Sequence, residues 1–139
     1  EKESELEILR TRSYVPGLDH LSPVLSREEL LELQNKTEQV KIDSSLLEYV
    51  LKIIQATREH PALLLGASPR AGLALKDSAK ARAVLKERDY VVPDDIKALA
   101  VPVLRHRLIP KQDFSQPEKK IEQTEMIILE ILEQIPVPV

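Results

Sequence analysis

Apolar residues recur at spacings of three and four positions along three long segments of the chain. This spacing places side chains on one face of an α-helix and predicts that the face is buried. In residues 43–59 the stripe consists of Leu47, Val50, Leu51 and Ile54. In the segment that starts at residue 93 it consists of Ile96, Leu99, Ala100, Val103 and Leu104. In residues 118–135 it consists of Ile121, Ile128, Ile131, Leu132 and Ile135.

Start and stop signals frame these helices and add others. Residues 26–29, Ser-Arg-Glu-Glu, match a capping box and predict a helix that runs to about residue 37. Asp43 is a good N-cap for the next helix, which should stop at residues 60–61, His-Pro, because a residue before proline avoids the α region. Ser68 followed by Pro69 predicts a further helix, which continues to about residue 86.

Two short extended segments, residues 40–42 and 90–92, are candidates to pair with each other. The opening residues show a short helical pattern that ends near residue 12. Together these patterns predict an all-α fold: a small bundle of four to five helices, with at most one tiny two-stranded pairing.

Composition supports one small domain and excludes several functions. The chain has 139 residues, of which 42% are apolar and 31% charged. Its formal net charge of −3, without a basic stripe, argues against a nucleic-acid partner. No apolar run approaches the ~18 residues of a membrane span, and the absence of cysteine fits a cytoplasmic location. The highly charged first residues fit a chain that continues from a preceding segment.

Catalytic and metal-binding patterns are largely missing. His20, His60 and His106 lie far apart in the sequence, so no metal site is expected. Asp94 and Asp95 are best explained as carboxylates that stabilise the first turn of a helix through its dipole. The charged residues 105–107 fit a solvated face. No phosphate-binding loop is present, so we expect that the chain cannot hydrolyse ATP alone.

Arg70 is the residue with the most chemical interest. It falls in the first turn of the helix that Ser68 and Pro69 begin, where free backbone amides and the positive end of the dipole favour an anion. A guanidinium there adds a charged, two-pronged donor. From the residues alone, an anion site and an ordinary surface ion pair both remain open.

Several segments, taken in order, closely resemble the C-terminal lid of MoxR-family AAA+ ATPases. They are residues 56–61, 65–71, 88–100 and 103–108, and the tail 131–138 is also similar. The resemblance covers roughly residues 20–109 well. It implies that Arg70 is the sensor 2 arginine, which would reach the γ-phosphate of ATP, and that Ala67, Ser68 and Pro69 would lie beside the nucleotide. Val92 departs from the family, in which Thr or Ser more often caps the helix at Pro93.

The resemblance also implies an organisation and partners. Residues 1–12 would be the hinge or first helix from an ATPase core, residues 13–110 the lid, and residues 111–139 a linker and a C-terminal amphipathic helix. The partners would be the protein's own N-terminal core, which holds ATP and Mg²⁺, further copies in a homo-hexameric ring, and a von Willebrand factor A-domain protein. The assembly would act like a chaperone. The alternatives are a stand-alone helical interaction module without a nucleotide role and the lid of a related magnesium-chelatase-like ATPase.

Overall fold

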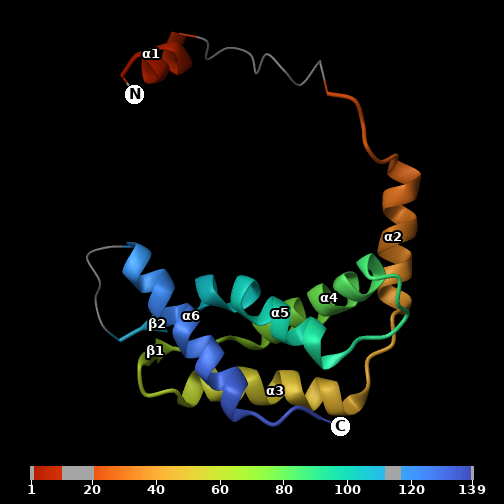
Figure 1. Cartoon of the computed structure of the whole chain (residues 1–139), viewed down its shortest axis with the longest axis vertical. Coiled ribbons are helices and arrows are strands. Elements are labelled where there is room, and N and C mark those ends of the chain that lie inside the picture. The colour runs from red at the N-terminus through yellow and green to blue at the C-terminus, as the bar shows by residue number, and fades with distance from the viewer. Residues whose placement is uncertain (1, 11–20, 112–116, 139) are drawn as a thin grey trace. The chain divides into compact units, whose positions relative to one another are not determined.

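The computed structural model describes residues 2–10, 21–111 and 117–138. Its helices are α1 (Lys2–Arg10), α2 (Arg27–Gln39), α3 (Ser44–Glu59), α4 (Pro69–Leu85), α5 (Pro93–Leu104), the 3₁₀ helix η2 (Arg105–Arg107) and α6 (Pro117–Gln134). Its strands are β1 (Leu63–Leu65) and β2 (Ile109–Pro110). The all-α prediction is confirmed, with six α-helices in the described residues (Figure 1).

The chain divides into two compact units, residues 1–30 and residues 31–139. The second unit contains α3 to α6 and all of the buried core. Within the described residues, no helix is both long and apolar enough to span a membrane. His20 and most of the predicted linker before α6 lie outside the described residues.

The predicted caps are largely confirmed. At the start of α2 the Glu29 backbone amide donates to the Ser26 hydroxyl (3.1 Å), and the Ser26 amide donates to the Glu29 carboxylate (2.7 Å). Asp43 caps α3 by accepting the Ser45 amide at 2.8 Å. Ser68 occupies the N-cap of α4 in an extended conformation, but its hydroxyl makes no capping hydrogen bond. Proline at the first helical position therefore defines this start more than the serine side chain does.

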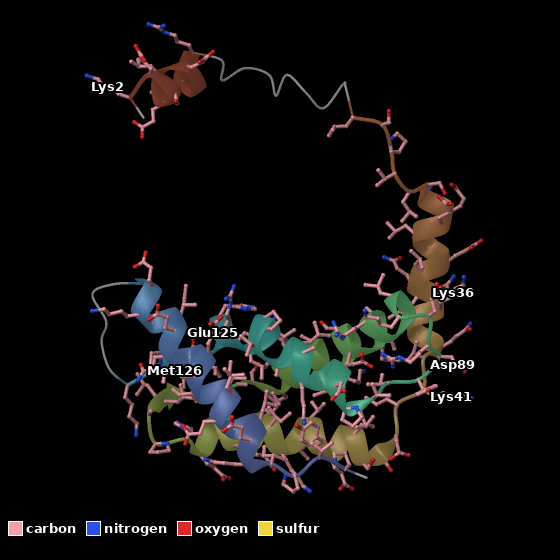
Figure 2. The ribbon with its side chains drawn as sticks, viewed as in Figure 1. Lys2, Lys36, Lys41, Asp89, Glu125 and Met126 are labelled. Carbon is pink, nitrogen blue, oxygen red and sulfur yellow. The ribbon has the colours of Figure 1, made fainter. Side chains whose placement is uncertain are left out.

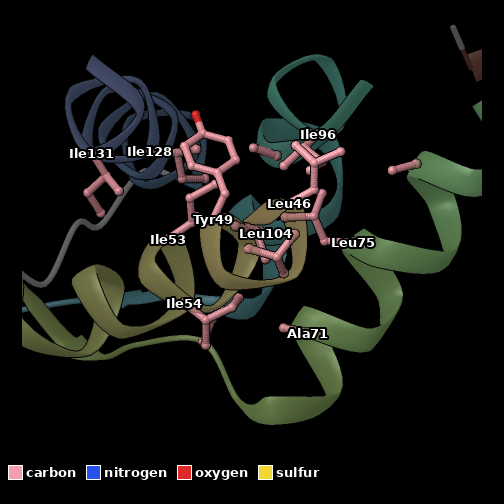
Figure 3. Close-up of a cluster of buried hydrophobic side chains, with 14 of the residues drawn as sticks. Leu46, Tyr49, Ile53, Ile54, Ala71, Leu75, Ile96, Leu104, Ile128 and Ile131 are labelled. Carbon is pink, nitrogen blue, oxygen red and sulfur yellow. The ribbon is translucent and has the colours of Figure 1, made fainter. Parts of the chain in front are cut away.

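The core lies where α3, α4, α5 and α6 meet (Figure 3). Helix α4 packs on α3 and α5, and α6 packs on the same two helices. The labelled core residues are Leu46, Tyr49, Ile53, Ile54, Ala71, Leu75, Ile96, Leu104, Ile128 and Ile131. The C-terminal helix is thus part of this domain's own core.

The predicted stripe on α3 is wrong in two of its four residues. Leu47 and Leu51 are 42% and 53% exposed, whereas Val50 and Ile54 are buried as predicted. The buried face is rotated because α3 is covered by both α4 and α6. It consists of Leu46, Tyr49, Val50, Ile53, Ile54 and Thr57.

On α5 and α6, the predicted buried residues agree better with the structure than on α3. On α5, Ile96, Ala100 and Leu104 are buried. On α6, Ile128 and Ile131 are buried as predicted, and Thr124 and Ile127 join them. Ile121, which was assigned to the same stripe, is exposed.

The two-stranded pairing exists, but the sheet does not use the predicted segments. Strands β1 and β2 pair antiparallel, with Leu63 opposite Pro110 and Leu65 opposite Ile109. Both strands fall outside the helices and the two extended segments that the sequence predicts. This pairing joins parts of the chain more than forty residues apart, which local patterns do not encode.

The predicted pairing of residues 40–42 with residues 90–92 is reduced to one parallel bridge between Lys41 and Tyr90. The Lys41 amide donates to the Asp89 carbonyl oxygen (2.8 Å), and the Val91 amide donates to the Lys41 carbonyl oxygen (3.0 Å). Figure 2 shows Lys41 and Asp89 on neighbouring segments. The bridge ties the segment before α3 to the segment before α5.

Tyr49 carries a buried hydroxyl without a hydrogen-bond partner among the described residues. Burial raises the pKa of this phenol above its ordinary value. We expect Tyr49→Phe to leave the free energy of unfolding unchanged or to raise it by up to about 1 kcal/mol, because an unpaired buried hydroxyl carries a desolvation cost. Denaturant unfolding measures the change, and a loss of more than about 1 kcal/mol would contradict an unpaired hydroxyl.

Candidate functional site

The first turn of α4 presents Arg70 at the surface. The side chain is exposed and makes no hydrogen bond or ion pair with any residue that the structure describes. The surface ion pair that was left open by the sequence is therefore not formed within the described residues. Ser68 and Pro69 are exposed beside it, and Ala67 is buried. The start of α4 is therefore a solvent-exposed surface that carries an unpaired guanidinium.

The residues before α4 are held against the end of α3. The Ala67 amide donates to the Thr57 hydroxyl oxygen at 2.9 Å, and Arg58 Nε donates to the Ala67 carbonyl oxygen at 2.8 Å. Gly66 passes so close to α3 that a Cβ there would lie 2.5 Å from the Arg58 Cα. The position therefore requires glycine, because no side chain fits at that distance.

A hollow of about 530 Å³ opens beside this junction. It is lined by Arg58, residues 64–69 and Arg107, so two arginines and no carboxylate face it. Arg107 donates through Nε to the Val103 carbonyl oxygen (2.9 Å), which steadies its side chain. Two cations beside a helix N-terminus favour an anionic ligand.

From the sequence, Arg107 is expected on a solvated face, with no sign that it lies near the residues that precede α4. The pairing of β1 with β2 brings Arg107, two residues before β2, to the same hollow as the residues that follow β1. Arg58 was noticed only as part of the resemblance. Neither arginine carries a local signal that would have marked it.

The other end of α4 carries a second polar cluster, centred on Asp95. Its carboxylate, 2% exposed, accepts two hydrogen bonds from the Arg88 guanidinium at 2.8 and 2.9 Å. It also accepts the Val92 backbone amide at 3.0 Å. Arg82 Nε lies 3.3 Å from Asp95 Oδ1, close enough for an ion pair although its orientation is poor for a hydrogen bond.

The prediction that Asp94 and Asp95 lie in the first turn of α5 is confirmed, but the helix dipole does not fully account for Asp95. Asp94 is exposed, while Asp95 is the buried centre of an ion-pair cluster. By accepting the Val92 amide, Asp95 forms one half of a capping box, whereas the valine side chain cannot form the other half. The missed signal is the position of Asp95, the third residue of a helix, which is where a carboxylate reaches back to the N-cap amide.

Burial alone would raise the pKa of the Asp95 carboxyl. The hydrogen bonds from Arg88 and from the Val92 amide, and the charges of Arg88 and Arg82, outweigh burial and hold that pKa below its ordinary value. The same pairing raises the pKa of Arg88. Asp95 is therefore charged at neutral pH and binds the end of α4 to the start of α5.

The chain reaches this cluster through a tight turn after α4. The Arg88 amide donates to the Ala83 carbonyl oxygen and the Glu87 amide to the Val84 carbonyl oxygen, both at 2.9 Å. These are the two hydrogen bonds of a Schellman motif, and Glu87 takes the left-handed position with φ of 57°. Since α4 has 17 residues and is therefore about 25 Å long, the cluster and Arg70 lie toward opposite ends of a long helix. We therefore assign Asp95 to structure and take the Arg70 end as the candidate site.

Comparison with known proteins identifies the family of this domain. The family model described as the AAA lid domain matches residues 55–131. The Bacillus subtilis protein YeaC is 41% identical over 137 residues, which cover 97% of this chain and 41% of YeaC. The chaperone MoxR1 of Mycobacterium tuberculosis is 31% identical over 145 residues, which cover 98% of this chain and 37% of MoxR1.

A solved structure extends the likeness to three dimensions. The crystal structure of a candidate ATPase from Cytophaga hutchinsonii superposes with a TM-score of 0.73 at 35% identity, covering 100% of this chain and 44% of that one. The chain thus spans about two fifths of the length of the curated relatives described above. It belongs to the AAA lid domain family and is homologous to the MoxR-family AAA+ ATPases.

Proposed function

We propose that this domain is the nucleotide-sensing lid of a MoxR-type ATPase and that Arg70 contacts the γ-phosphate of ATP. The observation that carries the proposal is the free guanidinium of Arg70 in the first turn of α4, exposed and unpaired among the described residues. Phosphoryl transfer is catalysed mainly by positioning and by stabilising charge on the phosphate oxygens. An arginine already directed outward can do this for a nucleotide held by another domain.

The surroundings of Arg70 support a nucleotide as the ligand. The hollow lined by Arg58, Arg107 and residues 64–69 combines positive charge with apolar surface. Ala67, Ser68 and Pro69 would lie beside the bound ATP, and the ATPase core would hold its Mg²⁺. ATP would bind between the two domains, so the lid alone would bind it weakly.

Exposed leucines near Arg70 supply a surface for that core. Leu64 and Leu65 of β1 and Leu73 of α4 are all more than half exposed. Leu73 follows Arg70 by one helical turn and so lies on the same side of α4. Apolar side chains grouped beside a charged site are typical of a surface that a partner covers.

We further propose that the complete protein forms a homo-hexameric ring in the cytoplasm, in which rotation of the lid reports the nucleotide state. MoxR1 is named a chaperone, and a chaperone-like action with a von Willebrand factor A-domain partner is our expectation for this protein too. A magnesium-chelatase-like ATPase would use Arg70 in the same way. A stand-alone interaction module would not use it at all.

Arg70→Ala in the full-length protein tests the proposal. We expect kcat for ATP hydrolysis to fall by about 10²-fold, the usual effect of removing one charge-stabilising donor. The melting temperature should stay unchanged, because the side chain is exposed and makes no hydrogen bond or ion pair with the described residues. Steady-state phosphate release measures turnover.

Arg27→Ala is the matched control for this experiment. Arg27 is also an exposed arginine in the first turn of a helix, α2, but it is not among the residues that line the hollow. We expect its removal to leave turnover as in the wild type. Unchanged turnover in Arg70→Ala would remove Arg70 from the mechanism and would favour the interaction module.

A further inference from the structure

Thr57, in the last turn of α3, is one of three buried polar side chains among the described residues. The others are Asp95, which forms the ion-pair cluster, and Thr124, whose hydroxyl donates only to carbonyl oxygens of its own helix. Thr57 differs because its hydroxyl joins two elements. It donates to the Ile54 carbonyl oxygen at 2.6 Å and accepts the Ala67 amide at 2.9 Å.

This hydroxyl occupies a position that a water molecule cannot replace easily. Thr57 is 0% exposed and Ala67 is 1% exposed, so the Ala67 amide has no access to solvent. A buried amide that loses its acceptor stays unpaired, which is strongly disfavoured. The Ala67 carbonyl is taken by Arg58 Nε, so consecutive α3 residues hold both polar groups of Ala67.

We infer that Thr57 is a positioning residue for Arg70, an inference that rests on the function proposed above. Ala67 is the last residue before the N-cap Ser68, and Arg70 follows three residues later inside a rigid helical turn. The anchor at Ala67 therefore fixes the origin and the direction of α4 with respect to α3. A displacement of about 1 Å at a catalytic group far from the changed residue can cost about 10²-fold in rate.

The test compares Thr57→Val with Thr57→Ser in the full-length ATPase. Valine keeps the shape but removes the hydroxyl, and we expect kcat to fall about tenfold through misplacement of Arg70. Serine keeps the hydroxyl and should restore most of the wild-type kcat. Thr124→Val is the matched control, since it also removes a buried threonine hydroxyl but one that bonds only within α6, and it should leave kcat unchanged.

A double-mutant cycle identifies the residue through which Thr57 acts. If Thr57 positions Arg70, then Thr57→Val should lower kcat no further in a protein that already carries Arg70→Ala. Additive losses in the double variant would overturn the inference, because Thr57 would then act independently of Arg70. A wild-type kcat for Thr57→Val would overturn it as well.

The outcomes also separate this inference from the proposed function. A loss of turnover in Arg70→Ala with none in Thr57→Val overturns only the positioning role, whereas an Arg70→Ala variant without effect overturns both. Amide hydrogen exchange of the unmodified protein adds a test that does not depend on how the variants fold. The Ala67 amide, which belongs to no helix or strand, should exchange as slowly as the amides in the middle of α3. Rapid exchange there would also overturn the inference.

Discussion

Asp95→Asn is expected to lower the free energy of unfolding by about 3 kcal/mol. The change removes the negative charge that pairs with Arg88 and Arg82. It also leaves a single amide oxygen as the acceptor for donors that share two carboxylate oxygens in the wild type. Breaking a buried ion pair typically costs about 3–5 kcal/mol. We expect a cost at the lower end of this range, because the Arg88 and Arg82 side chains are 22% and 38% exposed. Water can therefore partly hydrate them once the carboxylate is gone. Denaturant unfolding of the chain measures the difference.

Asp94→Asn provides the control for this prediction. Asp94 lies in the same first turn of α5 and meets the same helix dipole, but it is exposed and has no ion pair among the described residues. We expect its replacement to change the free energy of unfolding by no more than about 0.5 kcal/mol. Equal losses in the two variants would contradict the structure and would favour a dipole effect common to both carboxylates.

The ion pairs of Asp95 also predict that the free energy of unfolding depends on pH. Since the folded state holds the pKa of Asp95 below its ordinary value, its contribution to stability is complete above the unfolded pKa of about 3.9. That contribution is lost as the pH falls through the lowered folded pKa. The difference in unfolding free energy between wild type and Asp95→Asn should therefore be constant near neutral pH and shrink below about pH 4. A difference that grows on acidification would contradict this sign.

Gly66→Ala is expected to damage both the fold and the proposed activity. Its Cβ would lie 2.5 Å from the Arg58 Cα and 2.6 Å from the Thr57 carbonyl oxygen, and backbone atoms cannot turn away as a side chain can. The junction between β1 and α4 must then move, at a cost of about 2–3 kcal/mol. We also expect kcat to fall, because the movement would displace the helix that carries Arg70.

Gly72→Ala separates this close approach from a general effect of replacing glycine. A Cβ at Gly72, inside α4, would meet the Ile54 side chain at 3.4 Å, close but able to adjust, and alanine favours a helix by about 0.8–1 kcal/mol over glycine. Gly72→Ala should therefore be neutral or stabilising. Unfolding curves and ATP turnover of the two variants provide the measurement. A Gly66→Ala protein with wild-type stability would show that the junction is looser than the structure describes.

Helix starts and the candidate arginine were largely accessible from the sequence. The capping box of Ser26 and Glu29, the Asp43 cap and the Ser68–Pro69 start depend on residues within four positions of one another, so their signals are local. Arg70 stood out for the same reason, and the resemblance to MoxR lids gave it a role. Its exposed, unpaired state could not be derived, because any acidic residue brought near by folding would have paired with it.

The tertiary structure alone decided which faces are buried and which distant residues meet. Leu47 and Leu51 fit the helical spacing as well as their buried neighbours do, and only the packing of α4 and α6 on α3 leaves them exposed. The hollow beside Arg70 needs the β1–β2 pairing, and the Ala67 anchor needs Thr57 ten positions earlier. Local sequence determines a helix because its hydrogen bonds join residues four apart. The candidate site depends on contacts across tens of residues, which exist only once the helices have packed.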